Sequence, residues 1–345
     1  MARSTLSTPI AILSIIAGAG AFVVTQAVTK DTFEPILAAC GNAKDYATME
    51  DFVAQTGYHR YDKLAGMGVL DVFVCMITQF FVFLVERSPA GMLTWGTTII
   101  SAIPAMMLIL LEAGRSGNRA LLLWPTTFSL IAQFLGISVV FPLLWVPSYC
   151  FFANESGVVN LSLARSLVFW CLPFTLLSVA AFVLPVDSDE WTLVAGTLAG
   201  PLICLTGLIA WILGPPATPT QKDVAASAEA AGVSFGMGGI LALLGWFYMI
   251  YTVLINYGMD YEALWKDLWT DAHPSIQFMS IDASVLWVGL VLHIASRKLS
   301  SVAEVLLLTP FFGPGAACCM ALASLEMDRV PPVSNSSSDE IKKDK

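Results

Sequence analysis

The sequence predicts an all-α membrane protein, a single polytopic bundle of about eight or nine transmembrane helices. Hydrophobic residues make up 57% of the 345-residue chain and charged residues only 12%, with a mean hydropathy of +0.74. A soluble domain has about a quarter charged residues, so this chain can be stable only if lipid covers most of its surface. Its net charge of −9 gives no basic surface for nucleic acid, which excludes that class of partner.

Long apolar stretches mark the expected spans, because about 20 apolar residues are needed to cross roughly 30 Å of hydrocarbon. Two stretches, 64–85 and 276–296, reach this length only by including an acid, Asp71 in the first and Asp282 in the second. The expected spans of a single domain over residues 1–326 are 8–28, 64–85, 93–111, 120–142, 166–185, 191–213, 233–255, 276–296 and 304–325.

Three further segments complete the predicted topology. Stretch 120–154 is too long for one helix, and the prolines in its second half predict a bend into an interfacial segment. Segment 256–275 mixes Trp and Tyr with acids, which predicts a helix on the membrane surface between two spans. Residues 327–345 are rich in Pro, Ser and charge and predict a disordered polar tail.

The Lys and Arg residues of the loops predict the orientation, since cytoplasmic loops carry the excess of positive charge. With nine spans, Arg115 falls on the more basic face and Arg297 on the opposite one. The more basic face, with residues 30–63, is therefore expected in the cytoplasm, in a multi-pass protein of the endoplasmic reticulum. The sequons at Asn154 and Asn160 then lie on the lumenal face as candidate N-glycosylation sites, which would make the protein a glycoprotein.

The cysteines and histidines predict no metal site. The chain has seven cysteines and three histidines, with no CxxC motif and no Cys/His spacing typical of a zinc site. It also has no acidic motif of the kind that binds a substrate diphosphate through magnesium ions. Neither a metal nor an organic cofactor is expected. Several cysteines lie within apolar runs, where a thiol usually serves as a small hydrophobic side chain: Cys75, Cys171, Cys204, Cys318 and Cys319.

Acids inside the apolar segments are the candidate catalytic residues, because an Asp in lipid costs roughly 2.5–3.5 kcal/mol on insertion scales. Asp71 heads a polar stripe at positions i+4, i+7 and i+8, and Asp282 shares a helix face with His293. The alternative for both is a hydrogen bond to a neighbouring helix or a side chain that extends to the membrane interface. Glu112 is the third candidate, with a structural ion pair to Arg115 at the bilayer edge as the alternative.

Four stretches carry a family resemblance: FEPILAACGNAKDYATMEDF at 33–52, LLEAGRSGNR at 110–119, LGISVVFPLLWVPSY at 135–149 and PFFGPGAA at 310–317. Together they resemble the fungal integral-membrane terpene cyclases of meroterpenoid and indole-diterpene clusters, the group of the ascofuranone terpene cyclase and the paxilline A-type proteins. The resemblance extends over nearly the whole chain.

The resemblance implies a metal-independent enzyme of the isomerase type in secondary-metabolite biosynthesis. Such an enzyme protonates an epoxidised or olefinic prenyl chain on an aromatic or indole acceptor, and the chain closes through carbocations. The implied partners are a hydrophobic prenylated substrate, the lipid bilayer, and a pathway prenyltransferase and flavin epoxidase.

This chemistry needs a carboxylic acid kept protonated by burial, together with a dry site lined by aromatic faces. In the nine-span scheme Asp71, Glu112 and Asp282 converge at one mouth of the bundle, with Glu304 at the other. We expect the proton donor in this cluster, with Asp71 first because its span cannot cross the bilayer without it.

Two other functions stay open on the sequence alone. A transporter of a hydrophobic metabolite would use broken helices, which Pro142, Pro147 and Gly313 would favour, although the chain shows no convincing internal repeat. A non-catalytic membrane scaffold for pathway enzymes would need no intramembrane acids.

Overall fold

The computed structural model describes residues 6–42, 45–46, 48–58, 68–86, 89–185, 188, 191, 194, 212–213 and 221–330. Within these residues the regular secondary structure is helical, with one isolated β-bridge between Arg115 and Val159, which confirms the all-α prediction. The expected span 191–213 falls almost wholly outside the described residues, as does most of the predicted tail.

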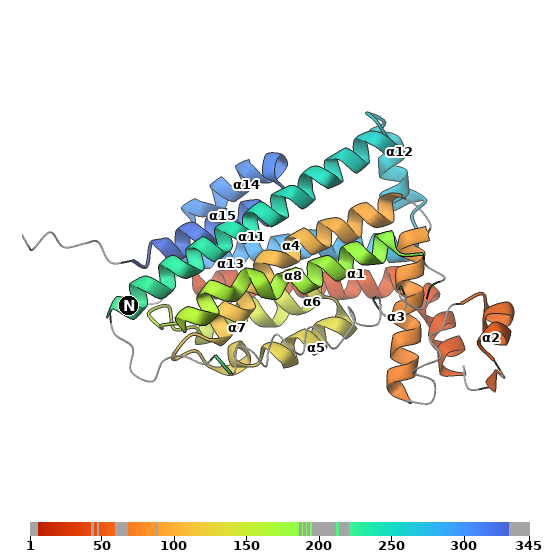
Figure 1. Cartoon of the computed structure of the whole chain (residues 1–345), viewed down its shortest axis with the longest axis horizontal. Helices are drawn as coiled ribbons and strands as arrows, with labels where there is room; N and C mark the ends of the chain where they lie inside the picture. The colour runs from red at the N-terminus through yellow and green to blue at the C-terminus, as the bar shows by residue number, and fades with distance from the viewer. Residues whose placement is uncertain are drawn as a thin grey trace, which may run out of the picture.

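Five helices in the described part are long and apolar enough to cross a membrane. They lie side by side along the long axis of the molecule (Figure 1). The shortest has 23 residues, about 35 Å of helix, which exceeds a hydrocarbon core of roughly 30 Å. They are α1 (Ser7–Gly41), α4 (Pro89–Ala113), α8 (Leu161–Val183), α11 (Gln221–Asn256) and α13 (Pro274–Arg297).

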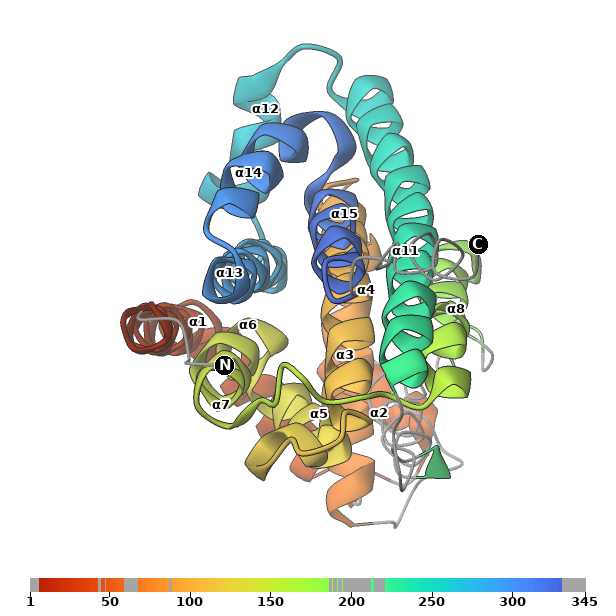
Figure 2. The ribbon, with the colours of Figure 1, turned by 90° about the vertical axis from the view of Figure 1, so that its left-hand side faces the viewer.

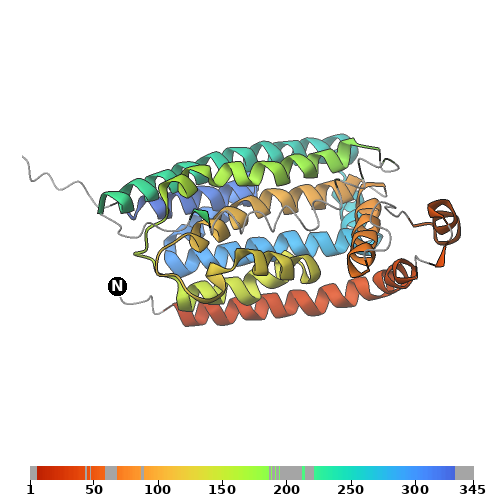
Figure 3. The same ribbon diagram turned by 60° about the horizontal axis from the view of Figure 1, so that its bottom comes forward.

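Residues 120–153, the first hairpin, enter the bundle and return to the end from which they came. The chain reverses at Gly136, whose φ of +87° is in the region that favours glycine. Figure 3 shows this hairpin in yellow beside α1. Its elements are η3 (Ala120–Leu123), α5 (Pro125–Leu135), α6 (Ile137–Val140), the π-helical turn η4 (Phe141–Trp145) and α7 (Val146–Phe152).

The two ends of the first hairpin are held together by hydrogen bonds. The backbone N–H of Ser116 donates to the carbonyl of Val158 at 2.9 Å, and the N–H of Asn154 donates to Oδ1 of Asn118 at 2.6 Å. The predicted span 120–142 is therefore not a single crossing helix, because the chain reverses within it.

Residues 300–327 form a second hairpin, from α14 (Ser300–Phe312) and α15 (Pro314–Met327). The reversal again falls at a glycine with positive φ, Gly313 at +82°. Lys298 and Asp328, on either side of the hairpin, form an ion pair at 2.8 Å, so the chain returns to its starting level. Each arm is about 20 Å long, too short to cross the membrane, and the predicted span 304–325 is two short helices (Figure 2).

The helix α3 (Val69–Glu86) lies across one end of the bundle, roughly perpendicular to the five long helices (Figures 1 and 3). The predicted span 64–85 therefore does not run parallel to the others. A disulfide between Cys40 and Cys75 joins α3 to the end of α1. Cys75 is thus not the small hydrophobic side chain that its apolar surroundings predicted. The count of eight or nine spans is not confirmed.

The remaining short helices lie at the same end as α3 (Figure 1). They are α2 (Met49–Thr56), α12 (Tyr261–Trp265) and the π-helical turn η5 (Lys266–Thr270). Helical structure in segment 256–275 is as predicted, and two of its aromatic side chains, Tyr261 and Trp265, are largely exposed. Its place on a membrane surface stays a prediction.

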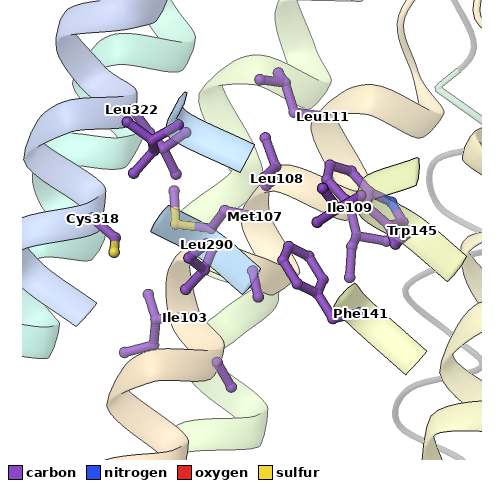
Figure 4. Packing of buried hydrophobic residues seen from close by; sticks show 14 of the residues in the cluster. Ile103, Met107, Leu108, Ile109, Leu111, Phe141, Trp145, Leu290, Cys318 and Leu322 are labelled. Atoms are coloured by element: carbon purple, nitrogen blue, oxygen red, sulfur yellow. The ribbon is translucent and has the colours of Figure 1, made fainter. Parts of the chain in front are cut away.

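The largest core cluster lies where both hairpins pack against the long helices. Figure 4 shows members of this cluster from four parts of the chain: Phe141 and Trp145 of the first hairpin, Met107 of α4, Leu290 of α13 and Leu322 of α15. Because α4 is buried along nearly its whole length, the other long helices and not this one form the outer surface of the bundle. The hairpins therefore enclose α4 on the inside of the bundle.

The two hairpins change the grouping of the positive charges. Arg115 and Arg297, which the nine-span scheme placed on opposite faces, both bond to Glu326. We call the end of the bundle that contains Arg115, Arg297 and Glu326 the basic end. The opposite end, which contains the Cys40–Cys75 disulfide, is called the disulfide end. The cations whose side chains are described are, at the disulfide end, Lys30 and Lys266 and, at the basic end, Arg115, Arg119, Arg165, Arg297, Lys298 and Arg329.

We expect the basic end to face the cytoplasm and the disulfide end an oxidising lumen, the reverse of the sequence prediction. Both the positive-inside rule and the chemistry of disulfide formation favour this orientation. An efficient glycosylation acceptor with spacers inserted after Gly57 should receive a glycan in microsomes. The same acceptor inserted after Glu155 should receive none, and the opposite pattern would contradict this orientation.

Candidate functional site

A cavity of about 310 Å³ lies between α1, α3, α4, α5 and α13. It follows one face of α4 from Trp95 to Leu110, about 22 Å of helix. The cavity is therefore long and narrow, and most of its wall is apolar. This shape suits an extended or loosely folded hydrocarbon chain better than a compact ring system.

Aromatic rings form the wall of the cavity near the disulfide end. Phe80 contacts Phe33, Phe81 and Phe278 with ring centroids 5.6–5.9 Å apart, and Phe81 contacts Trp95 edge-on at 4.9 Å. The rings come from α1, α3, α4 and α13, so the wall exists only in the folded bundle. Ring faces of this kind stabilise a nearby cation by about 0.5–2 kcal/mol each.

Asp282 is the one carboxylic acid among the described residues that line this cavity. It lies on α13 and its side chain is 4% exposed. The backbone N–H of Ser138 donates to its Oδ1 at 3.0 Å. A Cβ at Gly136 would lie 3.0 Å from the same oxygen, so the glycine lets the turn of the first hairpin approach the acid closely.

Asp71 lies elsewhere. It is in the first turn of α3, is half-buried, and does not line the cavity. The next residue of its predicted polar stripe, Cys75, is in the disulfide to α1. The reason that placed Asp71 first, a span that must include it, does not apply, because α3 lies across the end of the bundle.

Glu112 belongs to a buried ion network at the basic end. Nε of Arg115 donates to both carboxylate oxygens of Glu112 at 3.0 Å, and Nδ2 of Asn118 donates to Oε2 at 2.9 Å. The side chains of Glu112 and Arg115 are 0% and 3% exposed. The structural ion pair, the alternative interpretation from the sequence, is the one that the structure shows.

The second acid of the network is Glu326, which accepts hydrogen bonds from Arg115 at 3.2 Å and Arg297 at 2.7 Å. Arg329 lies 3.4 Å from the same carboxylate and donates to the carbonyl of Glu155 at 2.7 Å. Burial disfavours the charged form of Glu326, but the three arginines together lower its pKa below the ordinary value of 4.5. The network therefore joins α4, α13 and the ends of both hairpins.

The predicted convergence of three acids at one mouth is wrong. The hydroxyl of Thr98 on α4 donates to the carbonyl of Met279 on α13 at 3.3 Å, which sets these two helices at the same level. From that level Glu112 is 14 residues along α4 and Asp282 three residues along α13, a difference of about 16 Å. Asp282 and Glu112 thus belong to two different sites.

The sequence analysis missed the second acid of the network, Glu326, and the hydrogen-bond donor to Asp282, Ser138. Glu326 was placed at the edge of a disordered tail, yet it is buried at 1% exposure and Arg329 beyond it is hydrogen-bonded. The available signal was the position of Glu326 directly after the last apolar stretch. Ser138 gave no signal, because its contribution is a backbone N–H.

The two candidate glycosylation residues use their side chains in the fold. Nδ2 of Asn154 donates to the carbonyl of Ser116 at 3.0 Å, and Oδ1 of Asn160 accepts from the N–H of Ser162 at 2.9 Å, capping α8. Their modification stays a prediction. Within the described part of the chain, no group of three or more His, Cys, Asp or Glu residues is placed to hold a metal.

Fold and site together define a helical protein of membrane type with an internal apolar cavity and one buried carboxyl group in its wall. Residues 43–187, less than half of the chain, match the CtvD domain. The matched region contains α3, α4, the first hairpin and Glu112, and ends before Asp282. The chain matches no curated protein and no solved structure.

Proposed function

We propose that this protein is a terpene cyclase of fungal secondary metabolism. Its substrate is an aromatic or indole compound with a prenyl chain that carries a terminal epoxide or olefin. The observation that carries the proposal is the position of Asp282, a buried acid in the wall of a long cavity lined by aromatic rings. The match to the CtvD domain supports a role in secondary-metabolite biosynthesis.

Asp282 would act as the general acid. In its protonated form it transfers the proton to the epoxide oxygen or to the terminal olefin, and a carbocation develops on the adjacent carbon. The chain's own double bonds or the aromatic acceptor attack this cation and close the ring. Loss of a proton from the cyclised cation returns one proton to the carboxylate, so the product is an isomer of the substrate.

The surroundings of Asp282 suit both halves of this cycle. The N–H of Ser138 stabilises the carboxylate that remains after proton transfer, through Oδ1. The rings of Phe80, Phe278 and Trp95 face a cavity whose apolar wall keeps out water, which would otherwise capture the cation. Nothing in this cycle requires a metal or an organic cofactor.

The substrate chemistry implies the neighbouring steps. A prenyltransferase must attach the chain, and a flavin epoxidase must oxidise it where the trigger is an epoxide. Because the substrate is apolar, it would partition into the bilayer, and a cavity inside a membrane bundle is the place to receive it. An endoplasmic reticulum location for all three enzymes follows from this proposal.

Transport of a hydrophobic metabolite is the second candidate function. It is favoured by the two hairpins, whose chain reversals at Gly136 and Gly313 resemble the broken helices of transporters. Gly136 is also part of the cavity wall. A scaffold role would leave both the cavity and Asp282 without a use.

Product analysis separates the three functions. Microsomes from a yeast host that expresses the protein would be incubated with a farnesylated phenol and with its terminal epoxide. A new compound of unchanged mass that contains an added ring supports the cyclase. A change only in the distribution of unaltered compound across the membrane identifies a transporter, and no change in either contradicts both.

A further inference from the structure

The cavity reaches the outer surface of the bundle between α1 and α5. Gln26 on α1 is exposed and Phe134 on α5 is 65% exposed, and both also line the cavity. Val23 and Leu130, about one helical turn before these residues, are apolar and exposed at 66% and 42%. Lys30, one turn after Gln26 toward the disulfide end, is exposed and pairs with Glu34. A surface of this composition faces lipid, so the opening is lateral.

The polar groups around this opening differ in their hydrogen bonds. The hydroxyl of Thr29 donates to the carbonyl of Thr25 at 2.7 Å. The hydroxyl of Thr98 likewise donates to the carbonyl of Thr94, one turn earlier in its own helix, at 2.9 Å. The side-chain amides of Gln26 and Gln133, by contrast, bond to no described residue, and both line the cavity. Both amides border the cavity beside its opening, where a ligand in the cavity can reach them, so these two glutamines are placed to bond to a ligand.

We propose that Gln26 and Gln133 bind the polar head of the cavity's ligand, a phenolic or indolic ring that carries hydrogen-bonding groups. The prenyl chain of the same molecule occupies the apolar cavity, and the molecule enters from the bilayer between α1 and α5. This proposal rests on the proposed function, which it deepens by assigning the head group to one wall and the chain to the interior.

The register of α5 places this head group near the acid. Gln133 is three residues, about 5 Å of helix, from Gly136, against which Asp282 packs. A chain whose head is held at Gln133 must therefore fold back to bring its far end to Asp282. Folding the chain back in this way is what ring closure toward the aromatic head requires.

The test is a binding measurement on the intact protein purified in detergent, without turnover. The probes are a farnesylated phenol and its O-methyl ether, which keeps the chain but cannot donate a hydrogen bond. Intrinsic tryptophan fluorescence, with Trp95 in the cavity wall, reports binding. We expect the wild-type protein to bind the phenol about five- to tenfold more tightly than the ether, the effect of one hydrogen bond.

The Gln26→Leu and Gln133→Leu variants should bind the phenol and the ether with nearly equal affinity. Gln55→Leu, the same exchange at an exposed position on α2 away from the cavity, is the matched control and should keep the preference. Equal binding of both probes by the wild type, or an unchanged preference in both cavity variants, overturns the head-group site. Because no product is measured, preserved discrimination without cyclisation would overturn only the proposed function.

Discussion

Replacing Asp282 by Asn should abolish ring formation while the amount of protein in the membrane stays near that of the wild type. Asn has nearly the same size and its amide oxygen can still accept the hydrogen bond from Ser138, but it has no acidic proton. A positioned general acid typically contributes about 10²–10⁴-fold to the rate. Product formation by microsomes containing equal amounts of each protein, determined from a calibrated immunoblot, is the measurement.

Glu304→Gln is the control for this experiment, because Glu304 is exposed on α14 and does not line the cavity. It should keep the activity of the wild type. If Asp282→Asn cyclises at the wild-type rate while Asp71→Asn is inactive, the sequence ranking is right and the assignment from the structure is wrong. Binding of the farnesylated phenol by Asp282→Asn would show that its cavity is intact.

Replacing Arg115 by Met should destabilise the protein by about 3–5 kcal/mol, because it leaves Glu112 buried without its cation. Glu326 loses one of its arginines in the same variant. We expect a marked fall in the temperature at which the purified protein loses its monodisperse peak in size-exclusion chromatography. The same fall should appear with Glu326→Gln, which removes the carboxylate shared by Arg115 and Arg297.

Two comparisons separate this effect from a general loss of charge. Lys298→Ala breaks an ion pair whose side chains are 47% and 54% exposed, and should cost less than about 1 kcal/mol. The double variant Glu112→Gln/Arg115→Met should be more stable than Arg115→Met alone, since no unpaired charge remains at Glu112. A double variant that is no better than the single one would show that Arg115 acts by packing.

The same network predicts a dependence of stability on pH. The folded state lowers the pKa of Glu326, so its contribution is fully present above the ordinary value of 4.5. It is lost as the pH falls through the lower pKa of the folded state. Thermal stability of the wild type should therefore fall below about pH 4.5 by more than that of Glu326→Gln.

The membrane character and the helical class follow from composition alone. With 12% charged residues, the composition predicts a lipid-covered bundle, in which helices satisfy their backbone groups within one segment. Local order was also enough to predict the Glu112–Arg115 pair as an alternative, because residues three apart on a helix end are neighbours. Local sequence also predicts Asp282 as a candidate site residue, because it is an acid within an apolar segment.

Tertiary structure alone decided which apolar stretches form single helices long enough to cross a membrane. Hydropathy measures the length of an apolar run but not the direction of the chain within it, so reversals at Gly136 and Gly313 are invisible to it. The orientation of α3 across the bundle is likewise a matter of packing, and with it the position of Asp71 outside the cavity. These three features account for the wrong grouping of the charges.

For the candidate site as well, the sequence and the tertiary structure each determined a different part. The sequence determined that acids and aromatic rings are present in apolar segments, because residue type and local hydropathy are properties of each segment by itself. Only the packed bundle decided that Asp282 faces a cavity, while Glu112, about 16 Å farther along the bundle, and Glu326 are neutralised by arginines in direct contact with them. The physical reason is that the role of a buried acid depends on which groups from distant segments lie within a few ångströms of it, since charge pairing and burial favour opposite protonation states.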